Sequence, residues 1–127
     1  MHTQTTNGIT ITVEAFYQPE HSRPLANKHV FSYRVIIENR GLDTVQLRRR
    51  HWYILDSNGI CREVEGEGVV GSQPVLLPSD SHQYTSWCPL MTEMGKMYGT
   101  FLMEKEDGSY FDARIPEFHL VAPHKMN

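Results

Sequence analysis

The sequence predicts an all-β protein, an antiparallel β-sandwich of seven or eight strands. Three observations lead to this expectation. Apolar and polar residues alternate with a period of two in several segments, as half-buried strands require. Asn58-Gly59 and Asp107-Gly108 stand between such segments, and these dipeptides favour the tight turns of hairpins. No segment repeats apolar residues at the i, i+3, i+4 and i+7 spacing of an amphipathic helix.

The first half of the chain contains four expected strands. Alternation marks the first two, Asn39 to Asp43 reads as the turn after them, and Asn58-Gly59 joins the next two. These strands are residues 9–15, 31–37, 45–55 and 60–64. A chain of 127 residues fits one domain. We expect that domain over residues 9–123, with flexible ends at residues 1–8 and 124–127.

The second half contains a glycine-rich loop and further strands. The loop is expected from Gly66 to Ser72, and prolines confine the apolar run from Pro74 to Pro78 to a sheet edge or to a stretch without ladder hydrogen bonds. Asp107-Gly108 joins two strands, and Pro116 is expected to end the second of them. The remaining strands are expected over residues 81–87, 97–103, 110–115 and 118–121.

Composition excludes several classes of partner. The net charge of −3 gives no basic surplus for nucleic acid. No stretch approaches the roughly 20 apolar residues that membrane insertion needs. The N-terminus lacks the basic and apolar regions of a secretory signal, which predicts a cytoplasmic protein. Cys61 and Cys88 could form one bridge, but two free thiols are the expectation in a reducing compartment.

The pattern Gly66-x-Gly68-x-x-Gly71 has the spacing of a dinucleotide-binding motif. In such motifs a helix follows the glycines and its N-terminus holds the phosphate. Here Pro74 follows closely and no helical periodicity succeeds it. The preferred interpretation is a structural loop whose glycines supply positive φ or close backbone approach. The alternative is an anion site in which backbone N–H groups bind the ligand.

The run from Arg48 to His51 is locally cationic. On a regular strand Arg48 and Arg50 share one face, whereas Arg49 and His51 share the other. Arg48 and Arg50 could pair with a phosphate or carboxylate. Arg50 and His51 are the candidate anion-binding residues beside the glycine loop, and Arg48 and Arg50 are candidate interface residues. The competing interpretation is a solvated face that pairs with glutamates such as Glu63 and Glu65.

The sequence shows neither a catalytic nor a metal-binding constellation. The seven histidines lack the spacing of ligands on one helix or one strand, so no metal site is predicted. Neither cysteine has the surroundings of an activated thiolate. Trp52, in the middle of an expected strand, is predicted to anchor the core, whereas Trp87 is predicted to lie near a surface edge and to suit a partner.

Several motifs together resemble the bacterial ApaG family, also called CorD. The resemblance covers about residues 10–123 and departs from the family pattern at Ser79 and Trp87, where members often have glycine. Its motifs are Arg50-His51-Trp52, Asp56-x-x-Gly59, the block from Glu63 to Pro74, Leu77-Pro78, Tyr84-x-Ser86, Leu90, Gly95-x-Met97-x-Gly99, and Phe111-Asp112 through Ile115-Pro116.

The resemblance implies a fibronectin type III-like or immunoglobulin-like sandwich without an established catalytic activity or cofactor. It associates the chain with cobalt resistance and magnesium efflux, and with a gene that often neighbours a diadenosine tetraphosphate hydrolase. A related domain in eukaryotic F-box proteins implies a role in protein interaction. The suggestion that the family's glycine motif binds pyrophosphate or nucleotides falls here on Gly66, Gly68 and Gly71.

The preferred hypothesis is a non-catalytic interaction module with an unknown protein partner or a homodimer. Trp87, Arg48 and Arg50 are its expected contact residues. The alternatives are a weak nucleotide or pyrophosphate binder, which uses the glycine loop with Arg50 and His51, and a divalent-metal binder that uses histidines and carboxylates. An enzyme has the least support, and no cofactor is expected.

Overall fold

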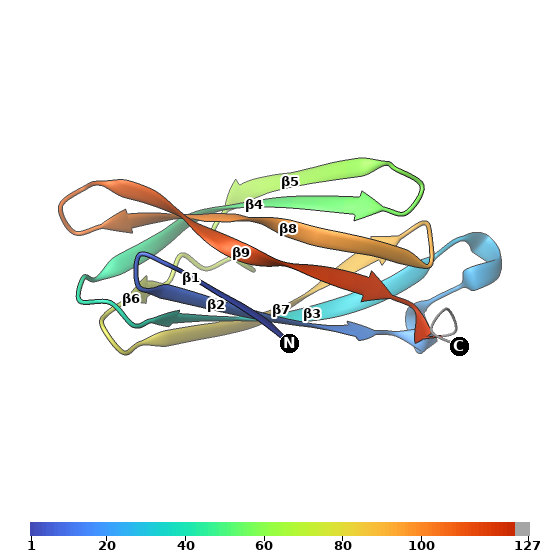
Figure 1. The fold of residues 1–127 in the computed structure, drawn as a ribbon, viewed down its shortest axis with the longest axis horizontal. Helices are drawn as coiled ribbons and strands as arrows, with labels where there is room; N and C mark the ends of the chain where they lie inside the picture. Colours follow the sequence, from blue (N-terminus) through green and yellow to red (C-terminus); the bar gives the residue numbers. More distant parts are fainter. Residues whose placement is uncertain (124–127) are drawn as a thin grey trace.

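The computed structural model describes residues 1–123, and two antiparallel sheets pack face to face in it (Figure 1). The predicted all-β sandwich is confirmed, although residues 1–123 form nine strands rather than the expected seven or eight. Residues 124–127, whose flexibility was expected, lie outside the described residues. No α-helix occurs in residues 1–123. None of the helical turns there has the length and apolar character that crossing a bilayer requires.

Four strands form one sheet and five form the other. The four-stranded sheet has the order β1 (His2–Thr6), β2 (Ile9–Tyr17), β3 (His29–Asn39) and β7 (Ser81–Leu90). The five-stranded sheet has the order β5 (Cys61–Glu67), β4 (Val45–Asp56), β8 (Met94–Lys105) and β9 (Tyr110–Val121), and the short β6 (Val75–Leu76) pairs with the start of β4. Two 3₁₀ turns, η1 (Pro19–His21) and η2 (Pro24–Ala26), connect β2 to β3.

The core lies between the two sheets and follows the predicted alternation. Trp52 is 2% exposed, which confirms its predicted place. Its ring centroid lies 5.3 Å from that of Tyr33 on the opposite sheet, and 6.1 and 6.0 Å from those of Phe101 and Phe118. Edge-to-face contacts of this kind are favourable for aromatic rings. The indole therefore joins the two layers.

Both predicted hairpins form. Asn58-Gly59 lies between β4 and β5, where the Asp56 N–H donates to the Ile60 carbonyl across 2.9 Å. Asp107-Gly108 lies between β8 and β9. Both glycines have positive φ, 90° and 83°, and this is the conformation that makes glycine favourable in such turns.

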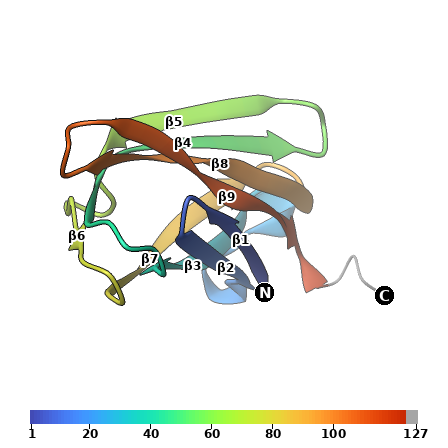
Figure 2. The same cartoon turned by 60° about the vertical axis from the view of Figure 1, so that its left-hand side comes forward.

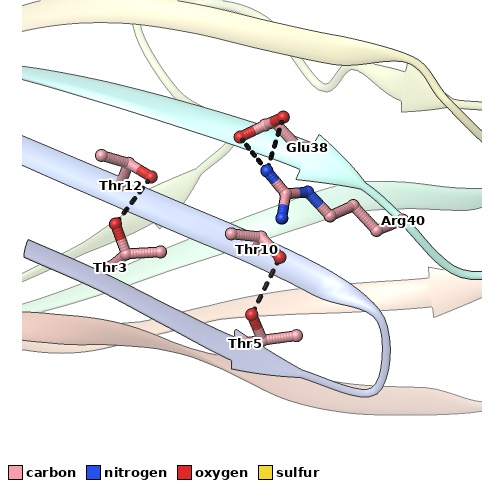
Figure 3. Close-up of polar contacts among 6 residues, drawn as sticks. All are labelled: Thr3, Thr5, Thr10, Thr12, Glu38 and Arg40. Atoms are coloured by element: carbon pink, nitrogen blue, oxygen red, sulfur yellow. Dashed lines mark hydrogen bonds and ion pairs between the residues drawn. The ribbon is translucent and has the colours of Figure 1, made fainter.

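A third hairpin corrects the expected flexible N-terminus. His2–Thr6 form β1, which pairs along its whole length with β2. The turn is Asn7-Gly8, where both residues have positive φ, as the favoured two-residue hairpin turn requires. Threonine pairs on the outer face connect the two strands: Thr3 with Thr12 at 3.2 Å and Thr5 with Thr10 at 2.9 Å (Figure 3).

The prediction that Pro116 ends a strand is wrong. β9 continues through Pro116 to Val121 as one strand. Its pairing with β8 shifts register between Met97 and Gly99, and Pro116 lies in the extra residues opposite this shift. A bulge is one of the few places where a strand tolerates proline, because that residue makes no ladder hydrogen bond.

The two long sides of the sandwich differ. On one side β1 and β2 lie against β9, and Arg114 donates its N–H to the Thr6 hydroxyl across 3.2 Å (Figure 2). The other side lies between β5 and β7, the last strands of their sheets. There Arg62 on β5 donates to the carbonyl of Pro89 on β7. The candidate functional residues gather on this second side.

Candidate functional site

A β-bulge at Arg48 rearranges the cationic run. The register of β4 with β8 shifts between Leu47 and Arg49, so one residue is inserted there. Leu47 faces the core before the shift, and Trp52 faces it afterwards. Arg50 therefore shares the inner face with Trp52, whereas Arg48 lies outside. The prediction that Arg48 and Arg50 share a face is wrong for this reason.

Arg48 is engaged on the outer surface. Its Nε lies 2.6 Å from a carboxylate oxygen of Glu104 on the neighbouring strand β8. Both side chains are partly exposed, so the pair contributes only roughly 0–1 kcal/mol. Arg48 is therefore partly accessible to a surface partner, but it already has an anionic neighbour.

Arg50 closes the open side of the sandwich against the glycine loop. Its Nη1 donates to the carbonyls of Glu67 and Gly68 across 3.0 and 3.1 Å. The guanidinium also acts on two core tyrosines. Burial raises the pKa of Tyr33 and, more strongly, that of Tyr84, and the positive charge of Arg50 offsets part of each rise. Arg50 is therefore a structural cation at the rim of the core.

Each glycine of the motif has its own geometric reason. A Cβ on Gly66 would lie 2.8 Å from Nη2 of Arg50, so a side chain there would displace the guanidinium. Gly68 has a φ of +65°, and its Cβ would collide with the carbonyl oxygen of Ser72. Gly71 has a φ of +76° in open space. Between them, Val69 is buried and fixes the loop to the core.

The loop directs carbonyl oxygens, rather than free N–H groups, toward the arginine. The N–H of Gly68 donates to the Arg48 carbonyl across 2.9 Å. Val69 and Ser72 exchange two backbone hydrogen bonds, at 2.8 and 3.0 Å. An anion bound here would compete with these bonds and with the loop carbonyls for Arg50. Anion binding by Gly66, Gly68, Gly71, Arg50 and His51 stays a prediction.

His51 lines one shallow pocket of about 210 Å³ together with Arg50, but its side chain pairs with glutamates of β5 rather than with the glycine loop. On the outer face its Nδ1 lies 3.1 Å from a Glu65 oxygen and its Nε2 lies 3.4 Å from a Glu63 oxygen. The ring stacks on Tyr53 with centroids 4.5 Å apart, and Tyr53 stacks on Tyr98 at 5.1 Å. A surface that pairs with Glu63 and Glu65 was expected from the cationic run. His51, rather than one of the arginines, makes these contacts.

The same three side chains could hold a cation. One ligand atom each from His51, Glu63 and Glu65 lie within 4.8 Å of one another, and imidazole with carboxylates suits borderline divalent metals. Spacing within one helix or one strand does not predict this group, because its members come from two strands. The hairpin register brings them together, since it sets His51 directly opposite Glu65.

Trp87 is the exposed aromatic residue of this side. Its side chain is 52% exposed on the outer face of β7, and the ring centroid of His21 lies 5.2 Å away in an edge contact. Beside it lies an open groove of about 460 Å³, lined by Glu20, His21, Arg23, Lys28, Val30, Trp87 and Pro89. The groove combines apolar surface with an excess of basic side chains.

The two thiols lie in different environments. Cys61 is exposed on β5, whereas Cys88 is buried on β7, and both are free. Burial raises the pKa of the Cys88 thiol to about 11, although the nearby Arg62 opposes this rise. A thiol with so high a pKa stays protonated at neutral pH, which is unfavourable for a nucleophile.

Comparisons with known proteins agree with this architecture. A family model described as the ApaG domain matches residues 19–105. Protein ApaG of Paramagnetospirillum magneticum is 54% identical over 125 residues, 98% of this chain and 96% of that protein. Protein ApaG of Brucella canis is 50% identical over 123 residues, 97% of this chain and 95% of that protein.

A solved structure extends the likeness to three dimensions. A crystal structure from Bordetella pertussis, named as an ApaA protein, matches with a TM-score of 0.88 at 43% identity, over 91% of this chain and 94% of that one. The sandwich, the glycine loop closed by Arg50, and the extent of these matches lead to one conclusion. The chain belongs to the ApaG family.

Proposed function

We propose that this ApaG-family chain is a non-catalytic protein-interaction module that contacts its partner through the surface around Trp87. The exposure of Trp87 carries the proposal. A half-exposed Trp on the last strand of a sheet leaves a large apolar side chain in water, and Trp is enriched in interface hot spots. The groove beside it, with Arg23 and Lys28, favours a partner with apolar and acidic groups.

The geometry favours Trp87 over the arginines as the contact residue. Arg48 is paired with Glu104, and Arg50 is bonded to the loop carbonyls. Either side chain would have to give up these contacts to bind a partner, whereas Trp87 would only lose exposed surface. The nucleotide or pyrophosphate alternative has less support for the same reason, because the guanidinium of Arg50, which would bind the anion, already donates to the carbonyls of Glu67 and Gly68.

The same proposal includes a role without catalysis and a location in the cytoplasm. The buried Cys88 thiol, with its pKa raised to about 11, is poorly suited to act as a nucleophile. We place the protein in the cytoplasm. The family resemblance extends the proposal to cobalt resistance and magnesium efflux, in which the module would act through its partner.

Affinity capture from a cell lysate tests the proposal. Trp87→Ala should lose the proteins that the wild-type chain captures. Tyr110→Ala should retain them, because Tyr110 is a similarly exposed aromatic residue at the start of β9. Capture that is equal for both variants would show that the contact surface is elsewhere. Repeating the capture with added Co²⁺ tests the cobalt connection, which predicts a change in the amount or identity of the captured protein.

A further inference from the structure

The four terminal strands of the two sheets are protected to different degrees. β1 and β9 lie against each other on one side of the sandwich. β5, on the other side, carries Glu63, Glu65 and Glu67, and charges of this kind prevent unwanted strand pairing. β7 is the exception, since its ten residues include no Asp, Glu, Lys or Arg. A long, uncharged terminal strand is open to pairing with another strand.

The hydrogen-bonding direction of β7 can be read from its pairing with β3. Asn39 donates its N–H to the Asp80 carbonyl just before β7 begins. Val30 is opposite Pro89 but uses its N–H for Ser22 and its carbonyl for Gln18, away from β7. Pairing in an antiparallel ladder alternates. The even-numbered residues of β7 therefore bond to β3, and the odd-numbered residues point their backbone groups outward.

Pro89 and Arg62 agree with this assignment. Proline has no N–H to donate, and a terminal strand tolerates it where that position faces away from the ladder. The carbonyl of Pro89 accepts a hydrogen bond from Arg62, which lies on β5 outside the four-stranded sheet. The outward-facing donors and acceptors of Gln83, Thr85 and Trp87 lie before this covered end, and the side chains of all three are exposed.

We propose that the β7 edge pairs with the β7 edge of a second copy of this chain, antiparallel about a twofold axis, to form a continuous eight-stranded sheet. This deepens the proposed function, on which it rests, by naming the partner. Charge favours the second copy, because a strand without charged residues sets no like charges against each other when it pairs with itself. A β5 pair would set glutamates against glutamates.

The second copy also provides a surface for Trp87. In an antiparallel pair centred near Tyr84, Trp87 of one chain stands opposite Ser81 of the other on the outer face. The outer face there is formed by small or uncharged side chains, Ser81, Gln83 and Thr85. Each indole would then cover its partner's strand, and the hydrogen-bonded edge and the exposed aromatic residue would form one interface.

Thr85 gives a sharp test. Its N–H points outward, so Thr85→Pro removes a donor from the intermolecular pair without removing one from the β3 ladder, as Pro89 does naturally. Thr85→Lys places a charge on each side of the axis. Thr85→Val is the matched control, because it keeps the N–H and the preference for strand. Sedimentation equilibrium over about 1 μM to 1 mM measures self-association, and circular dichroism measures folding.

The wild-type chain and Thr85→Val should form a dimer whose population rises with concentration, and Thr85→Pro and Thr85→Lys should weaken dimerisation at least tenfold. A wild-type chain that stays monomeric throughout overturns the inference, as does a dimer that survives both substitutions. If Thr85→Pro unfolds, Thr85→Lys decides alone. A monomeric chain whose lysate capture still depends on Trp87 would retain the proposed function and assign the edge to a different protein.

Discussion

Trp52 and Trp87 place the same side chain in opposite surroundings. Trp52 is 2% exposed between the sheets and contacts three aromatic rings, whereas Trp87 is 52% exposed. Trp52→Ala should lower the free energy of unfolding by about 3–5 kcal/mol, because it leaves a large cavity. Trp87→Ala should change it by no more than about 0.5 kcal/mol in the monomer. Urea denaturation at low protein concentration measures both. Equal midpoints for the two variants would contradict the assigned burial.

Cys61 and Cys88 should differ in reactivity. Iodoacetamide at pH 8 should modify exposed Cys61 quickly and buried Cys88 only when the chain opens. The Cys61→Ser variant should lose the fast phase. Burial raises the pKa of Cys88 to about 11, so folding favours its protonated form. This contribution to stability is complete below the unfolded pKa of roughly 8.5 and is lost as the pH rises through about 11. Two fast phases in the native protein would contradict this.

At the residue scale, the sequence predicted which residues are buried better than it predicted which face of a strand each side chain occupies. Trp52 was identifiable as a core residue from its size and its place in an alternating strand. The faces of Arg48 and Arg50 depend on one inserted residue, and the bulge that inserts it leaves no local signal in a run of three arginines. His51 contacts Glu63 and Glu65 because of the register of the β4–β5 hairpin. That register can be derived from the turn only when the length of the turn is known.

At the scale of the element, the glycine loop has two positions that differ in one respect. Gly68 and Gly71 both have positive φ, but only at Gly68 would a Cβ collide with backbone. Gly71→Ala should cost about 1 kcal/mol, the conformational term alone, and Gly68→Ala should cost clearly more. Thermal denaturation of the two variants measures the difference. Equal losses of stability in the two variants would indicate that the loop can move away from the Ser72 carbonyl at little energetic cost.

Gly68→Ala also tests anion binding by the loop. Pyrophosphate should bind no more tightly than about 1 mM, equivalent to about −4 kcal/mol, because Arg50 is bonded to the loop carbonyls. Calorimetric titration of the wild-type chain measures this. Micromolar binding that Gly68→Ala abolishes while the fold is retained would favour the nucleotide or pyrophosphate alternative instead.

Strand pairs were predictable where the sequence contains a dipeptide that favours a tight hairpin turn. Asn58-Gly59 and Asp107-Gly108 located two hairpins, and Asn7-Gly8 carries the same signal for the N-terminal hairpin, although chain ends are usually expected to fray. Pro116 was misleading because proline stops a regular strand but fits a bulge, and the bulge depends on the partner strand β8. Local sequence therefore located the turns, whereas tertiary pairing determined the irregularities.

At the scale of the whole molecule, one long side of the sandwich is closed by packed strands and the other side has an open strand edge. β1, β2 and β9 close the first through direct contact. On the second, Arg62 reaches from the five-stranded sheet to the Pro89 carbonyl on β7, Arg50 bonds to the glycine loop, and β7 keeps an unpaired edge. Sequence patterns predict strands but not which of them ends a sheet. The location of the open edge therefore required the strand order.

Amide hydrogen exchange tests this view of the molecule residue by residue. Strands with neighbours on both sides, such as β3, β4 and β8, should exchange slowly, because their N–H groups are bonded within the sheets. In β7 the protection should alternate: Tyr84 and Ser86 should be slow, because they donate to β3, and Thr85 should be fast at low protein concentration.

Raising the concentration separates the monomer from the self-paired form. If β7 pairs with a second copy, the exchange of Thr85 should slow as dimer forms, whereas that of Ser86 should change little because its bond to β3 exists in both states. Nuclear magnetic resonance resolves both amides. Protection that is equal at Thr85 and Ser86 in dilute solution would show that the outward direction of the odd-numbered residues is wrong. Alternation that persists unchanged at high concentration would leave the open edge intact and exclude the second copy as its occupant.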